Sequence, residues 1–257
     1  MILLKLAAAP AAVWLASYAG RRWGHRVAGL VGGFPLIAAP IVFFIAQDAA
    51  PAFTEELAWT TMAVAPGVAV HCFVYAWLAR LGAAWPLCLA CAWSACVGAA
   101  WVQSGFLLRG AEGLALALVQ GLLLAALMPR ARAAATLTPI PHFELIVRMV
   151  FALALATLLM FGAQTFGTRV SGVLMGFPIT ASVLPIFTLA LHGADATVRL
   201  LSGFALGLLG FVVYFFVFAS LVTTHGPGMA LAGGVITCVG TVSVALRLSR
   251  ARRVTEP

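Results

Sequence analysis

The sequence holds 257 residues, of which 63% are hydrophobic and only 9% are charged. Soluble domains are about 45–50% apolar and about 25% charged, so an ordinary soluble fold is excluded. The apolar content also excludes a disordered chain, and the long, unalternated apolar runs exclude a transmembrane β-barrel. The formal charge is +8, but the basic residues occupy short gaps between apolar runs, so no nucleic-acid surface is expected. The composition therefore predicts an all-α, polytopic membrane protein that lies in a lipid bilayer.

The apolar runs predict about nine transmembrane helices, since one span needs about 20 mostly apolar residues. The predicted spans are 2–20, 27–47, 57–79, 85–107, 111–128, 145–164, 170–191, 200–222 and 228–247. The stretch 129–142 is the only linker-like segment. We therefore expect a first four-helix repeat (1–110), a linking helix with a cytoplasmic loop (111–142) and a second four-helix repeat (143–257).

The two halves are related by a constant offset along the sequence. The segment Gly24–Pro35 aligns with Gly167–Pro178 without a gap, and seven of its twelve residue pairs are identical. The first span of one half corresponds to the sixth of the chain, which is an odd shift of five spans. An odd shift reverses the direction in which a helix crosses the membrane, so the sequence predicts two inverted repeats of the kind found in secondary transporters.

The distribution of basic residues predicts the orientation. With the N-terminus outside, twelve of the fifteen Lys and Arg residues fall on the cytoplasmic side, and only Lys5, Arg109 and Arg169 fall on the other. Cytoplasmic loops of membrane proteins are enriched in such residues. The expected topology is therefore N-terminus outside and C-terminus inside.

A Gly-Phe-Pro segment interrupts one predicted span in each repeat. The residues are Gly33, Phe34 and Pro35 in the first half and Gly176, Phe177 and Pro178 in the second. Proline leaves the carbonyl four residues earlier, here that of Val31 or Leu174, without its helical partner. Matched interruptions in two inverted halves indicate a central binding site, although the same prolines would also serve as simple packing kinks.

Polar groups inside the spans are few. His71 is the one clear ionisable residue within a span, and Tyr214 occupies the equivalent position in the second half. The two side chains either line the site between the halves, or His71 stays neutral and bonds to a neighbouring helix. Gln103, Gln120 and Gln164 are expected to join helices to one another.

Four basic residues are related by the repeat. Lys5 corresponds to Arg148, and Arg26 corresponds to Arg169. Such side chains commonly extend to the lipid headgroups. Their symmetric placement also leaves open an anionic partner, either a small anionic metabolite or a lipid-linked substrate.

No catalytic, metal-binding or cofactor motif is present. Cys88 and Cys91 form a Cys-x-x-Cys pair, but the pair lies inside an apolar run, where thiolates are disfavoured. We therefore expect no enzyme, no metal and no cofactor, and the sequence does not predict an oligomeric state.

Each half resembles the small four-helix GlpM-like membrane protein family. The resemblance rests on an early cation (Lys5 or Arg148), on the segments 28–35 and 171–178, and on a Pro/Gly-then-aromatic stretch in the next helix. It implies a location in the bacterial inner membrane and a link to envelope polysaccharide production.

Together these features predict an inner-membrane transporter or flippase-like permease. Its site would lie between the two interrupted helices and the helices that follow them, lined by the Gly-Phe-Pro segments, His71 and Tyr214. The alternative is a non-transporting accessory subunit that supports envelope polysaccharide or lipid biosynthesis.

Overall fold

The computed structural model describes residues 24–104, 109–132 and 142–254, together with isolated positions before residue 24. Within these ranges the chain is helical and forms no strand, which confirms the predicted all-α class. Lys5 and most of the predicted span 2–20 lie outside the described residues, as does most of the predicted linker after residue 132.

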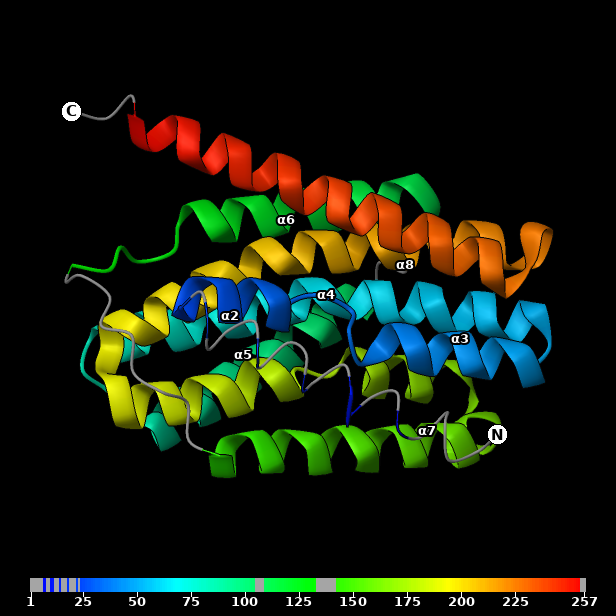
Figure 1. Cartoon of the computed structure of the whole chain (residues 1–257), viewed down its shortest axis with the longest axis horizontal. Helices are drawn as coiled ribbons and strands as arrows, with labels where there is room; N and C mark the ends of the chain where they lie inside the picture. Colours follow the sequence, from blue (N-terminus) through cyan, green and yellow to red (C-terminus); the bar gives the residue numbers. More distant parts are fainter. Residues whose placement is uncertain are drawn as a thin grey trace.

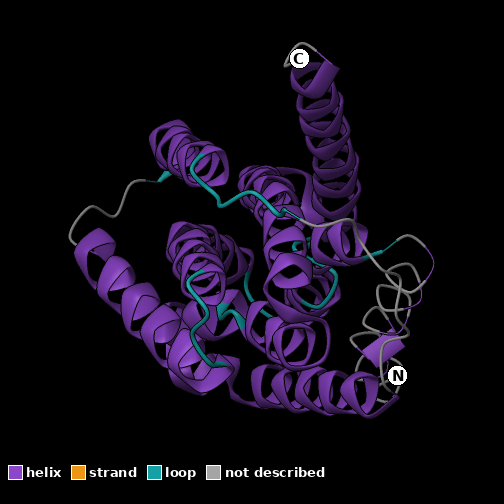
Figure 2. Ribbon diagram, turned by 90° about the vertical axis from the view of Figure 1, so that its left-hand side faces the viewer, coloured by secondary structure: helices purple, strands orange, loops and turns teal. Residues whose placement is uncertain are grey.

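The described helices run roughly along one direction, and Figure 2 shows most of them end-on. In chain order they are α2 (His25–Gly32), α3 (Ala38–Asp48), α4 (Pro51–Arg80), α5 (Trp85–Ser104), α6 (Gly110–Ala126), α7 (His142–Gly176) and α8 (Ile179–Val254). The backbone leaves the helical conformation at Gly167 in α7, and at Gly193 and Gly226 in α8. Residues 194–225, between the last two breaks, form the middle stretch of α8, which crosses the molecule in Figure 1.

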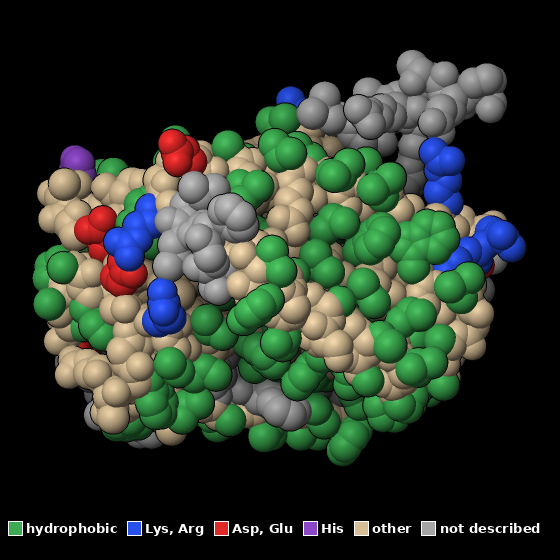
Figure 3. Space-filling model, turned by 180° about the vertical axis from the view of Figure 1, so that it is seen from behind, with side chains coloured by type: hydrophobic (Ala, Val, Ile, Leu, Met, Phe, Trp, Pro, Cys, Tyr) green, Lys and Arg blue, Asp and Glu red, His purple; other side chains and the backbone are tan. Residues whose placement is uncertain are grey.

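Three helical stretches among the described residues are long and apolar enough to cross a membrane. They are Pro51–Arg80, Trp85–Gln103 and Phe161–Arg247, the last of which includes the three glycine breaks. In Figure 3 hydrophobic side chains cover the middle of one face, whereas the charged side chains gather toward its ends. This distribution suggests a membrane protein, because side chains that contact lipid tails must be apolar.

Two helix starts coincide when the two halves of the sequence are aligned. Helix α2 begins after Gly24 (φ 87°), and the last part of α7 begins after the equivalent Gly167 (φ 76°). These positive φ values strongly favour glycine, so the repeated glycine has a structural reason. Likewise, α4 begins at Pro51, and the middle stretch of α8 begins at the equivalent residue 194.

Helix α4 and the middle stretch of α8, which are equivalent in the alignment, run in opposite directions. Arg80, at the end of α4, pairs with Asp195, at the start of the middle stretch of α8, with 3.3 Å between Nη1 and Oδ1. In Figure 1, the two elements lie along the core of the molecule and connect its two ends in opposite order.

Each interrupted helix packs against the other half. A Cβ added to Gly29 of α2 would overlap the backbone carbonyl oxygen of Leu200 in α8. At the equivalent place in the second half, a Cβ added to Gly172 of α7 would lie 2.6 Å from Cβ of Thr60 and 3.1 Å from the carbonyl oxygen of Leu57 in α4. Since Leu57 and Leu200 are themselves equivalent, glycine permits the same close contact twice.

Two of the three glutamines join helices as predicted. Gln103 of α5 donates from Nε2 to Oε1 of Gln120 in α6 at 3.0 Å, and Gln120 donates to the Pro66 carbonyl of α4 at 3.5 Å. Gln164 is exposed.

Candidate functional site

Both Gly-Phe-Pro segments line a single cavity of about 80 Å³. The sequence-predicted residues Gly33, Phe34, Pro35, Gly176, Phe177 and Pro178 all belong to its wall. Other parts of the wall come from the middle stretch of α8, which contributes Phe204, Leu208 and Phe211, and from Val68 of α4. The structure thus brings together two segments that lie far apart, in different halves of the sequence.

The two interruptions share a backbone hydrogen bond just before the proline, although the first breaks the helix over residues 33–37 and the second only over 177–178. The Phe34 N–H donates to the Val31 carbonyl at 3.2 Å, and the Phe177 N–H donates to the Leu174 carbonyl at 3.3 Å. Each carbonyl lacks the helical bond from the residue four positions later, as predicted, because that residue is proline, but it does not stay unpaired. A tighter turn of the 3₁₀ type gives each of them one hydrogen bond just before the proline.

His71 and Tyr214 are buried outside the described cavity wall, although the sequence placed them in the site. His71 is fully buried, and its Nε2 lies 3.2 Å from the carbonyl oxygen of Ala181 in the first turn of α8. Because a carbonyl only accepts, Nε2 carries the proton. His71 therefore joins α4 to α8, which is the second of the two roles expected for it.

Trp93 of α5 supports the second interruption, and the sequence analysis did not identify it. Its indole Nε1–H donates to the Ser182 hydroxyl at 2.9 Å, and Ser182 donates to the Pro178 carbonyl at 2.6 Å. The Trp93 ring also meets the Phe177 ring edge-on, with 4.9 Å between centroids. Together with His71, these contacts hold the start of α8 against the first half.

The equivalent residues do not support the first interruption. Trp93 corresponds to Ile236, which is 71% exposed, and Ser182 corresponds to Ala39, which has no hydroxyl. Tyr214 occupies the position equivalent to His71, and its hydroxyl is buried without a hydrogen-bond partner. The two interruptions therefore share a backbone hydrogen bond before the proline but differ in the side chains that hold them.

This difference predicts unequal backbone opening. Amides 179–182 should exchange with solvent about tenfold more slowly than the equivalent amides 36–39. The hydrogen bonds of Trp93, Ser182 and His71 are present only at the second interruption, and each contributes about 1 kcal/mol against opening of the backbone. Hydrogen–deuterium exchange followed by mass spectrometry would measure both segments in one sample.

Trp93→Phe keeps a ring against Phe177 but removes the indole donor, so it should bring the two exchange rates closer. Trp77→Phe is the matched control, since Trp77 donates to the Leu127 carbonyl elsewhere in the fold. Equal exchange of the two segments in the unmodified protein would contradict the proposed support.

The symmetric cations do not gather at the cavity. Neither Arg26 nor Arg169 belongs to its described wall, and Arg169 is exposed. Lys5 lies outside the described residues, and the structure describes only the backbone of Arg148. Among the residues that the structure describes, none with a charged side chain lines this cavity to contact an anionic substrate.

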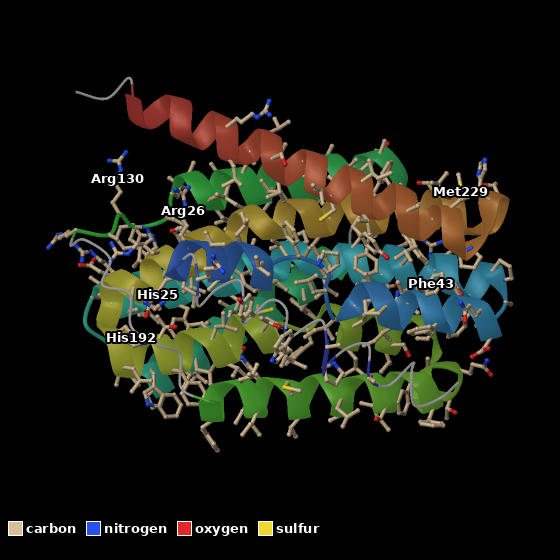
Figure 4. All side chains as sticks on the ribbon, viewed as in Figure 1. His25, Arg26, Phe43, Arg130, His192 and Met229 are labelled. Atoms are coloured by element: carbon tan, nitrogen blue, oxygen red, sulfur yellow. The ribbon has the colours of Figure 1, made fainter. Side chains whose placement is uncertain are left out.

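Several basic residues gather instead at one end of the molecule, which we call the basic end. Figure 4 shows His25, Arg26, Arg130 and His192 at this end, away from Phe43 and Met229. The His25 and His192 rings are 5.0 Å apart between centroids. Burial lowers the pKa of His25 below its ordinary value, and the neighbouring His192 and Arg199 lower it further.

The opposite end carries acidic residues. Glu56, near the start of α4, pairs with Arg109 at 2.7 Å between Oε1 and Nη2. Asp48 is the last residue of α3, and Glu55 lies near the start of α4. The two ends of the molecule therefore differ in the charge that they carry.

The described chain is an all-helical protein, and its long apolar helices suggest a membrane location. No known protein family, curated protein or solved structure matches the chain. Among the described residues, no group of three or more His, Cys, Asp or Glu side chains is placed to hold a metal ion.

Proposed function

We propose that this protein is a bacterial inner-membrane transporter or flippase-like permease with nine spans. In this proposal its two inverted four-helix repeats move against each other, so that the cavity opens first to one side and then to the other. The N-terminus lies outside and the C-terminus inside, because the basic end then faces the cytoplasm.

The packing between the halves supports the proposal. Opposite directions of α4 and the middle stretch of α8 are expected if the second repeat enters the membrane upside down. The paired contacts of Gly29 and Gly172 with the opposite half create two similar interfaces, and two similar interfaces allow the halves to exchange roles during transport.

The observation that carries the proposal is the shared cavity between the two Gly-Phe-Pro interruptions. Irregular backbone at membrane depth is tolerated where it is buried in protein or lines a cavity. A pair of prolines that served only as packing kinks would not need to meet at one space. The meeting of both interruptions therefore favours a binding site.

Cysteine accessibility tests alternating access without knowledge of the substrate. In a variant with all five native cysteines replaced by alanine, Ile37→Cys and Thr180→Cys place one thiol on equivalent parts of the cavity wall. We expect a membrane-impermeant maleimide to modify each thiol from either side of the membrane, because in this proposal the cavity opens widely to each side in turn and then exposes the thiol to water.

Arg130→Cys and Thr224→Cys, at exposed positions, serve as controls for the two sides of the membrane. Each should react from one side only. Modification of both cavity thiols from one side only, or from neither, would contradict a transporter and favour an accessory subunit of the kind that the GlpM-like resemblance suggests.

A further inference from the structure

We propose that the cavity binds a small, uncharged solute and that the Thr180 hydroxyl is the side-chain group that recognises it. The inference rests on the proposed function, because it names the class of substrate that the same cavity would carry. It differs from the anionic substrate that the symmetric cations suggested in the sequence.

The chemistry of the cavity wall disfavours an ion. Four phenylalanines line it, namely Phe34, Phe177, Phe204 and Phe211, and its other described residues are aliphatic residues, methionine, glycine or proline apart from Thr180. An ion that leaves water for such surroundings loses its hydration and meets no opposite charge, which costs several kcal/mol. An uncharged solute avoids most of this cost.

Thr180 is the only polar side chain of the described wall. Thr180 is half-buried. The Ser and Thr residues that the structure describes as fully buried donate their hydroxyls to a backbone carbonyl; Thr61 and Thr188, for example, bond to the carbonyl four residues earlier. The carbonyl four residues before Thr180 belongs to Gly176, at the interruption, and the described structure gives the Thr180 hydroxyl no hydrogen bond. The interruption thus leaves this hydroxyl able to bond to a solute.

The position of Thr180 gives the cavity two different sides. Its methyl carbon Cγ2 lies 3.3 Å from the place that a Cβ on Gly32 would take, so Thr180 reaches the first interruption. The equivalent residue of the first half is Ile37, which also lines the cavity but has no polar group. A solute with one polar and one apolar end fits this arrangement.

The cavity volume limits the size of the solute. An engineered protein cavity of about 150 Å³ holds benzene, which has six non-hydrogen atoms. The volume of about 80 Å³ would by the same ratio hold about three or four such atoms. Acetamide and acetate both have that size and nearly the same shape, but only acetate is charged at neutral pH.

The experiment measures how each compound protects Ile37→Cys, in the variant that lacks the native cysteines, from modification by the maleimide. We expect acetamide to slow modification and acetate to leave it unchanged. Adding Thr180→Val should weaken the protection by acetamide about threefold to tenfold, since the change removes one hydrogen bond. Thr188→Val is the matched control, because Thr188 lies outside the cavity wall and donates to the Leu184 carbonyl.

The outcomes separate this inference from the proposed function. Equal protection by acetate, absence of protection by acetamide, or unchanged protection in Thr180→Val would overturn the inference, even if both cavity thiols react from both sides. Protection that depends on Thr180, in a protein whose cavity opens to one side only, would support the solute site and contradict transport.

Discussion

Gly29→Ala is expected to lower the unfolding temperature of the purified protein strongly. The added Cβ would overlap the Leu200 carbonyl oxygen, a backbone atom of the opposite half. A backbone atom inside a helix cannot move away as the end of a side chain can, so α2 and α8 would have to separate. Overpacking of a well-packed core costs about 1–3 kcal/mol, and we expect the upper part of that range or more here.

The equivalent variant, Gly172→Ala, should be less harmful. Its added Cβ would lie 2.6 Å from Cβ of Thr60 and 3.1 Å from the Leu57 carbonyl oxygen. This overlap is smaller than the one at Gly29, so the two helices would have to separate less. Gly240→Ala is the control, because nothing lies within 4 Å of its added Cβ. In an open helical position, alanine is favoured over glycine by about 1 kcal/mol.

Thermal unfolding in detergent would rank the three variants. The expected order of stability is Gly240→Ala, then Gly172→Ala, then Gly29→Ala. If Gly29→Ala unfolded at the same temperature as Gly240→Ala, the close contact between the halves would not exist as described.

The sequence predicted the fold class and the meeting of the two interruptions because both depend on patterns. Apolar runs identify helices, and the constant offset between the halves pairs the Gly-Phe-Pro segments. The offset does not reveal, however, that Gly29 packs on Leu200 of the opposite half, since an internal repeat shows which residues are equivalent and not which ones touch.

Contacts between side chains were harder to predict than the backbone pattern. Trp93 lies on α5 among other apolar residues, and only the rotation of that helix brings its indole to Ser182. The role of Asp195 is similar: it accepts from the Arg80 side chain and from the Arg132 backbone N–H, which come from two distant segments. The sequence did contain a signal that could have identified Thr180. This residue follows Pro178 closely, and the carbonyl four residues before it, its usual helical partner, belongs to Gly176 at the interruption.

The double substitution Pro35→Ala and Pro178→Ala should close the cavity. Each alanine supplies a backbone N–H that can donate to the carbonyl of Val31 or Leu174, which restores the helical bond that proline prevents. Proline costs about 3 kcal/mol in a helix interior, so the continuous helices should form without loss of stability. We expect modification of Ile37→Cys and Thr180→Cys by the maleimide to slow at least about tenfold, which corresponds to about 1.4 kcal/mol.

Pro66→Ala distinguishes this effect from a general response to proline removal. Pro66 lies within the continuous helix α4 and is buried, but it does not belong to the described cavity wall. Its replacement should leave the cavity thiols as reactive as before. If the double variant also kept full reactivity, the interruptions would be packing kinks, and the shared space between them would have no part in transport. If only the double variant lost reactivity, the access route to the cavity would depend on the two interrupted helices, as the proposed mechanism requires.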